Sequence, residues 1–136
     1  MIVSFFDTNI FLYAASNAAE DLEKRQRAIQ LIRDRPCVIS AQVLQEFIAN
    51  VIRKKSLGLD ESHISGLMDF FSEGTVQPIT RELVQDACRI RRRFGISHGD
   101  ATIVAAAIKL GCKILYSEDL NHRQIYDGVE VINPFL

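Results

Sequence analysis

Short apolar segments alternate with longer amphipathic segments along this chain of 136 residues, and this alternation constrains its fold more than any other feature. The short segments have the length and composition of buried strands, and they cover residues 2–6, 37–40, 76–79, 113–116 and 129–132. The longer segments place apolar residues at helical spacing; they cover 21–34, 41–54, 61–73, 81–93 and 98–110, and another helix is expected directly after Asp7. This order predicts βαβ units, and therefore a mainly parallel sheet in a three-layer α/β/α sandwich.

Domain count, charge and cysteine content narrow the class of protein. No repeat and no linker rich in Pro, Gly or Ser interrupts the pattern, so we expect residues 1–136 to form a single domain. The 16 basic and 17 acidic residues give a net charge of −1, which argues against binding nucleic acid by bulk electrostatic attraction. The three cysteines form no Cys-x-x-Cys pair, so neither a disulfide framework nor a zinc site is expected. The N-terminus has no long apolar stretch and no basic leader, which predicts a cytoplasmic protein without a membrane span.

Four acidic residues are assigned to one edge of the predicted sheet. Asp7 follows the first strand directly, and Asp119 follows the fourth. Glu46 lies about two turns into the helix after the second strand, and Asp100 lies in the first turn of the helix that leads into the fourth strand. In an open α/β sheet the carboxyl ends of the strands and the beginnings of the next helices share one edge. We therefore expect these four carboxylates, from distant segments, to converge.

Each acid also has a purely structural interpretation. Asp7 can cap the next helix or form a turn, and Asp119 can be an ordinary loop acid. The segment from Ser97 to Asp100 has the form of a capping box. Glu46 is harder to explain in this way, because it lies close to an apolar stripe of its helix, where a lone carboxylate needs a partner. The four together favour a chemical site.

Carboxylates gathered in this way repel one another unless a cation lies between them. Oxygen ligands without a His or Cys pattern suit a hard divalent ion, Mg²⁺ or Mn²⁺. The histidines, His63, His98 and His122, lack the spacing of zinc ligands, and we assign them to the surface or to supporting roles beside the acids.

Several motifs resemble the PIN-domain family, and within it the VapC-type toxins of toxin–antitoxin modules. They are "FFDTN", the segment from Ser40 through Glu46, "SHGDATIVAAA" and "ILYSEDLNHRQIYDGVEVINPF", which together run nearly from end to end. The resemblance implies a five-stranded parallel sheet in the order 3-2-1-4-5 and a homodimer. It also implies a metal-dependent endoribonuclease that hydrolyses RNA to 5′-phosphate and 3′-hydroxyl ends, and a cognate antitoxin as its protein partner.

The resemblance assigns roles to individual residues. The four acids match the acidic positions of the family, with Asp7 and Asp100 as direct Mg²⁺ ligands and Glu46 and Asp119 as ligands directly or through water. The polar positions that orient the acids or the scissile phosphate are matched by Thr8, Asn9 and Ser117. Two positions depart from the family pattern, Gly99 where an aromatic residue is frequent and Arg123 where a glycine is common, and both concern substrate preference.

An acidic site must still attract an anionic substrate. The basic candidates are Arg89, Arg91, Arg92 and Arg93 before Asp100, and Arg53, Lys54 and Lys55 after the helix of Glu46. Such runs are also typical of solvated C-terminal helix ends, where the helix dipole stabilises cations.

Two other classes of protein remain open. A phosphatase of the Asp-x-Asp type would need an acid where Asn9 stands, and a receiver domain would need an acidic pair where Phe5 and Phe6 precede Asp7. A non-catalytic binding module with the same fold is disfavoured by the presence of all four acids.

Overall fold

The computed structural model describes residues 3–34, 36–54 and 58–136. Six strands form one sheet in the order β3-β2-β1-β4-β6-β5. Their bounds are Ser4–Phe6 (β1), Val38–Ser40 (β2), Thr75–Gln77 (β3), Ile114–Tyr116 (β4), Ile125–Tyr126 (β5) and Val129–Ile132 (β6). All neighbouring strands pair in parallel except β5 and β6. The five parallel strands follow the expected order 3-2-1-4-5, with β6 as the fifth.

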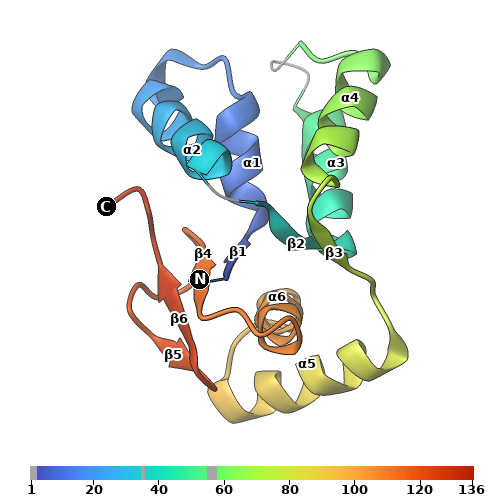
Figure 1. The fold of residues 1–136 in the computed structure, drawn as a ribbon, viewed down its shortest axis with the longest axis vertical. Coiled ribbons are helices and arrows are strands. Elements are labelled where there is room, and N and C mark those ends of the chain that lie inside the picture. Colours follow the sequence, from blue (N-terminus) through green and yellow to red (C-terminus); the bar gives the residue numbers. More distant parts are fainter. Residues whose placement is uncertain (1–2, 35, 55–57) are drawn as a thin grey trace.

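The helices lie on both faces of this sheet. They are α1 (Thr8–Ala15), the short 3₁₀ helix η1 (Ala19–Asp21), α2 (Leu22–Asp34), α3 (Ala41–Arg53), α4 (Glu61–Phe71), α5 (Arg81–Phe94) and α6 (His98–Lys109). Figure 1 shows α1 to α4 on one side of the strands and α5 with α6 on the other. The predicted three-layer α/β/α arrangement is therefore confirmed. None of the helices among the described residues is long and apolar enough to cross a membrane.

Helix starts are fixed by side chains that accept a hydrogen bond from a backbone N–H. Ser40 caps α3, Thr80 caps α5 and Ser97 caps α6, each from the N-cap position. The predicted end of α6 is also confirmed, because Gly111 just beyond it adopts a left-handed φ of 72°. Because Asp7 directly follows β1 and Ser40 is the last residue of β2, the switch from strand to helix occurs at one edge of the sheet, where α1 and α3 begin.

The core is built from fully buried strand residues such as Phe5, Phe6 and Leu115, packed against small side chains of α6. The alanines at 105, 106 and 107 let that helix approach the sheet closely. Cys37 and Cys112 are buried free thiols, and burial raises the pKa of each to about 11. They therefore stay protonated and act as apolar packing groups.

The structure differs from the sequence-based expectation at two strands. The third strand is Thr75–Gln77 rather than 76–79, because Pro78 has no N–H to donate to a ladder. The antiparallel strand β5 was not predicted. It pairs with β6 through a turn in which Asp127 and Gly128 have φ of 47° and 89°, the Asp-Gly hairpin signal that the sequence carries. Ile2, assigned to the first strand, and Lys55, assigned to the basic candidates, lie outside the described residues.

Candidate active site

Asp7 lies at the end of β1, almost fully buried at 4% exposure. Its Oδ1 accepts a hydrogen bond from the backbone N–H of Thr8 at 2.7 Å, and its Oδ2 accepts one from Ser117 Oγ at 2.8 Å. Burial raises the pKa of Asp7 to about 6, and the negative charges of Asp119 and Glu46 add to this effect, although the two hydrogen bonds oppose it. Asp7 is therefore both the helix cap and a carboxylate that lies close to other acids.

Ser117 joins the carboxylate of Asp7 to the segment after β4. Its side chain is fully buried, and its Oγ accepts hydrogen bonds from the backbone N–H groups of Asp119 at 3.2 Å and Leu120 at 3.4 Å. Because the same oxygen donates to Asp7, the turn that carries Asp119 is fixed relative to β1.

Glu46 points toward the same edge from α3. Its Oε2 accepts from Thr8 Oγ1 at 2.8 Å, and its Oε1 accepts from Gln42 Nε2 at 3.0 Å. The same Gln42 nitrogen also donates to the backbone carbonyl of Gly99 at 3.1 Å. This amide links α3 to the start of α6, one residue before Asp100, and supplies the partner that a carboxylate on this side of the helix requires.

The remaining two acids of the group are Asp119, in the turn after β4, and Asp100, in the first turn of α6. Asn9 forms a side-chain hydrogen bond with Asp119, which lowers the pKa of that acid, but loss of solvation and then the negative charges of Asp100 and Glu118 raise it above its ordinary value. The capping box predicted at Asp100 is half formed, because the backbone N–H of Asp100 donates to Ser97 Oγ at 3.1 Å. Its carboxylate makes no hydrogen bond within the described residues and faces the charge of Asp119.

The structure thus brings all four predicted acids and the three predicted polar residues into one connected group. The chemistry of this group fits a hard divalent cation, because its donors are oxygen atoms and because burial, together with the charges of neighbouring acids, raises the pKa of Asp7 and of Asp119. Within the described part of the chain, however, no three His, Cys, Asp or Glu side chains are arranged as ligands of one ion. Glu46, Asp100 or Asp119 would therefore have to turn further inward to share an ion with Asp7.

The predicted basic residues have varied surroundings. Arg91 and Arg92 are exposed at the end of α5, whereas Arg93 pairs with Asp127 at 2.7 Å and Arg89 pairs with Asp86. Lys54 lines a cavity of about 230 Å³ that also borders Asn9. A contact between RNA and Arg91, Arg92 or Arg93 stays a prediction.

Three residues beside the acids were missed by the sequence analysis. Gln42 holds Glu46 in place, and its position four residues earlier on a helix was the available signal. Tyr13 and Lys24 both bind Glu118, the neighbour of Asp119, from α1 and α2. Their sequence separation from Glu118 left no local pattern to find.

The structure describes the surroundings of the two residues that depart from the family pattern, and it explains neither residue type. A Cβ atom at Gly99 would meet a single neighbour, the Gln42 nitrogen at 3.9 Å, so the backbone there has room for a side chain. Arg123 adopts a left-handed φ of 73°, the conformation that glycine adopts without cost, and it pairs with Glu130 at 3.2 Å.

Comparison with known proteins identifies the family and the fold of this chain. The PIN domain family model matches residues 4–128. The fold is similar to that of a toxin–antitoxin complex from Klebsiella pneumoniae, with a TM-score of 0.70 at 17% identity over 96% of this chain and 97% of that one. It is also similar to a sarcin–ricin-loop-cleaving VapC toxin of Mycobacterium tuberculosis, with a TM-score of 0.67 at 21% identity over 85% of this chain and 89% of that one.

A third structure, a VapBC complex of Rickettsia felis bound to a DNA fragment from its promoter, has a TM-score of 0.65 at 18% identity over 96% of this chain and 97% of that one. A comparison with curated protein sequences found no significant match. At these identities the structural likeness establishes a shared fold, while the family match extends over most of the sequence. The chain therefore belongs to the PIN domain family.

Proposed function

We propose that this protein is an endoribonuclease that depends on Mg²⁺ or Mn²⁺ and acts as the toxin of a toxin–antitoxin pair. One observation carries the proposal: buried Asp7, whose pKa is raised to about 6, feels the charges of Glu46 and Asp119, and Asp119 in turn feels the charge of Asp100. A fold without a role for charge would place an apolar or amide side chain there, because burying a carboxylate costs free energy. Family membership and the resemblance to VapC toxins support the reaction class.

The residues divide into ligands and supports. We assign Asp7 and Asp100 as direct ligands of the cation, and Glu46 and Asp119 as ligands directly or through water. Ser117, Thr8 and Asn9 orient them, since each is hydrogen-bonded to one of the acids. When bound, Mg²⁺ or Mn²⁺ supplies a Lewis acid for the scissile phosphate and makes water more acidic.

A carboxylate near the attacking water would take up its proton or orient it. Asp119 is suited to this role, because it is exposed to solvent, and so is Glu46, because it is half-buried rather than enclosed. Attack by water rather than by the 2′-hydroxyl yields a 5′-phosphate and a 3′-hydroxyl. An antitoxin protein and a second copy of the chain are the partners that we propose, and light scattering of the purified protein tests the homodimer.

The decisive experiment compares acid variants on labelled RNA with Mg²⁺ or Mn²⁺. Asp7→Asn and Asp100→Asn should each lower the cleavage rate at least about 100-fold, since both remove a ligand charge. Asp86→Asn is the matched control, because it removes an acid that pairs with Arg89 on the outer face of α5. It should cleave like the unaltered protein.

Three results would overturn the assignment. They are cleavage by both site variants at the unaltered rate, cleavage that EDTA does not inhibit, and products that carry a cyclic phosphate. Absence of cleavage in the unaltered protein, on RNA of every class tested, would favour the non-catalytic binding module instead.

A further inference from the structure

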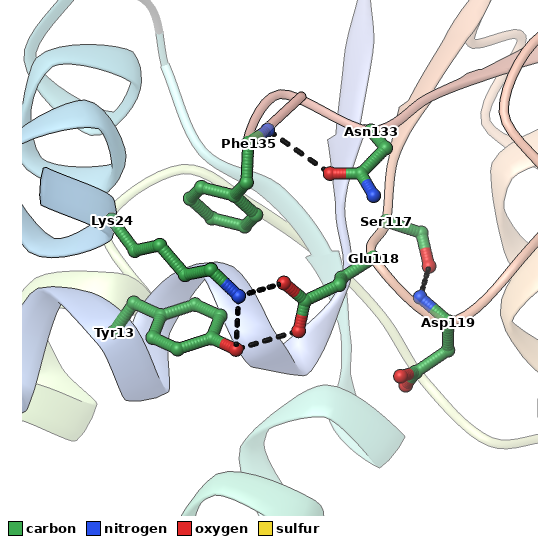
Figure 2. A network of polar contacts seen from close by, with 7 residues as sticks. All are labelled: Tyr13, Lys24, Ser117, Glu118, Asp119, Asn133 and Phe135. Atoms are coloured by element: carbon green, nitrogen blue, oxygen red, sulfur yellow. Dashed lines mark hydrogen bonds and ion pairs between the residues drawn. The ribbon is translucent and has the colours of Figure 1, made fainter. Parts of the chain in front are cut away.

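Glu118 stands between two residues of the candidate site, Ser117 and Asp119, yet its own carboxylate binds elsewhere. Tyr13 Oη donates to Glu118 Oε1 at 2.6 Å, and Lys24 Nζ donates to Glu118 Oε2 at 2.6 Å. Lys24 also donates to the Tyr13 oxygen at 3.2 Å, which closes a triangle of polar contacts. Figure 2 shows this triangle, with the carboxylate of Asp119 lying apart from it.

The triangle is held by aromatic rings as well as by hydrogen bonds. The Lys24 ammonium lies 4.8 Å from the centre of the Tyr13 ring and 5.7 Å from that of Phe135, and the two rings meet edge to face at 4.9 Å. The backbone N–H of Phe135 donates to Asn133 Oδ1, which fixes the C-terminal segment beside the lysine (Figure 2). Lys24 therefore has a more defined position than a lysine in an ordinary surface ion pair.

Helix α1 contacts two successive residues of the turn after β4. Asn9 hydrogen-bonds Asp119, and Tyr13, one helical turn further along, hydrogen-bonds Glu118. Residues four apart lie on the same face of a helix, so this one face of α1 sets the position of both acids. The same helix begins at Asp7 and carries Thr8, which binds Glu46.

The charge of Lys24 has a separate effect. Glu118 is a fifth acid next to a group of four, and an unpaired carboxylate there would add to their repulsion. The Lys24 ammonium, 2.6 Å from Glu118, offsets that charge. Glu118 still raises the pKa of Asp119, and the adjacent Lys24 cation opposes this repulsion.

We infer that Glu118 is a positioning residue of this site, acting through Tyr13 and Lys24 to hold Asp119 where it can serve a divalent cation and the reacting phosphate. This inference rests on the proposed function. Glu118 itself touches neither the cation nor the substrate. The contacts of its side chain fix the orientation of the turn after β4, and this orientation determines the position of the Asp119 carboxylate.

The test measures Mn²⁺ binding to the purified protein by electron paramagnetic resonance, together with RNA cleavage. Glu118→Gln and Lys24→Met should each weaken Mn²⁺ binding and lower kcat about 10-fold or more, the usual effect of removing a group that orients a ligand. KM for RNA should change less than about twofold, because no contact to the phosphates is altered. Lys24→Arg should restore both properties, since arginine keeps the cation.

Glu130→Gln is the matched control, because it makes the same chemical change in a carboxylate of β6 that pairs with the exposed Arg123. Thermal unfolding of every variant confirms that measurements are made on folded protein. Unaltered Mn²⁺ binding and kcat in both Glu118→Gln and Lys24→Met would overturn the positioning role alone. An equal loss in Glu130→Gln would overturn it as well. A parent protein that neither binds Mn²⁺ nor cleaves RNA overturns the proposed function, and the positioning role with it.

Discussion

Asp7 is the residue at which stability and chemistry conflict. Its oxygens accept two short hydrogen bonds, yet its burial and the neighbouring acids disfavour the ionised form. The pKa of about 6 in the folded protein exceeds the ordinary value of 3.8, so the folded state binds more protons than the unfolded state between these values. Ionised Asp7 therefore lowers stability as pH rises through this range.

We expect Asp7→Asn to be more stable than the parent protein in EDTA at pH 8, by about 2–3 kcal/mol. The gain should shrink toward zero at about pH 3, which lies below both pKa values, because Asp7 is then largely protonated in both states and its penalty disappears. Asparagine retains an acceptor for the Thr8 N–H, so the helix cap is preserved. Urea denaturation at both pH values measures the difference, and a gain that does not change with pH would contradict the burial of the charge.

The acids of the site and the polar residues Thr8, Asn9 and Ser117 were predictable from the sequence, whereas the supporting residues Gln42, Tyr13 and Lys24 were not. The positions of the four acids after strands and near helix starts are visible as a pattern, and the resemblance to the PIN family matches all four. The contacts of Gln42 with Glu46 and of Lys24 with Glu118 depend on side-chain rotamers and on distances across the fold. Nothing in local periodicity encodes these.

At the scale of elements, the pairing of β2 with β3 depends on one glycine. The Thr75 N–H donates to the Cys37 carbonyl at 3.1 Å, which brings Gly74 against that same carbonyl. A Cβ atom built on Gly74 would lie 2.0 Å from the Cys37 oxygen, well inside contact distance. Because the obstacle is backbone, it cannot move aside without separating the two strands.

Gly74→Ala should therefore lower the free energy of unfolding by about 2–4 kcal/mol. Gly66→Ala serves as the control, because that glycine lies in α4 with no neighbouring atom within 4 Å of the added carbon. It should raise stability by about 0.5–1 kcal/mol through helix propensity. Chemical denaturation measures the free energy of unfolding of both variants and of the parent protein. A Gly74→Ala variant as stable as the parent would show that β2 can shift without loss of stability.

Helices were predicted more closely than strands. The expected helix at 41–54 is Ala41–Arg53, and that at 81–93 is Arg81–Phe94, because amphipathic spacing and caps mark both ends. The strands have only two to four residues, too few for periodicity to set their limits. The two-residue strand β5 forms because its backbone pairs with β6, and this pairing depends on the assembled sheet rather than on the local sequence.

At the scale of the whole molecule, the site exists only in the completed sheet. Asp7 and Ser117, which share a hydrogen bond, are 110 residues apart in sequence, and they meet because β1 pairs with β4. An ion bound between the acids would therefore bind the folded protein and not the unfolded chain, and it would stabilise the whole fold.

We expect Mn²⁺ at about 100 times its dissociation constant to add about 2.7 kcal/mol to the free energy of unfolding, and to raise Tm by several degrees. Asp100→Asn should show little of this stabilisation, because it lacks a ligand charge. Differential scanning calorimetry with and without EDTA measures the effect. A parent protein whose Tm is the same with and without Mn²⁺ would contradict the proposed binding of the ion.

The central place of β1 also governs how the chain can be made. This strand precedes β4 in the chain, so one of its edges stays open until β4 has been translated. The carboxylates therefore cannot assemble while most of the polypeptide is still being synthesised. Under the proposed function, a nascent copy cannot cleave the RNA of the messenger and ribosome that produce it until β4 has been translated.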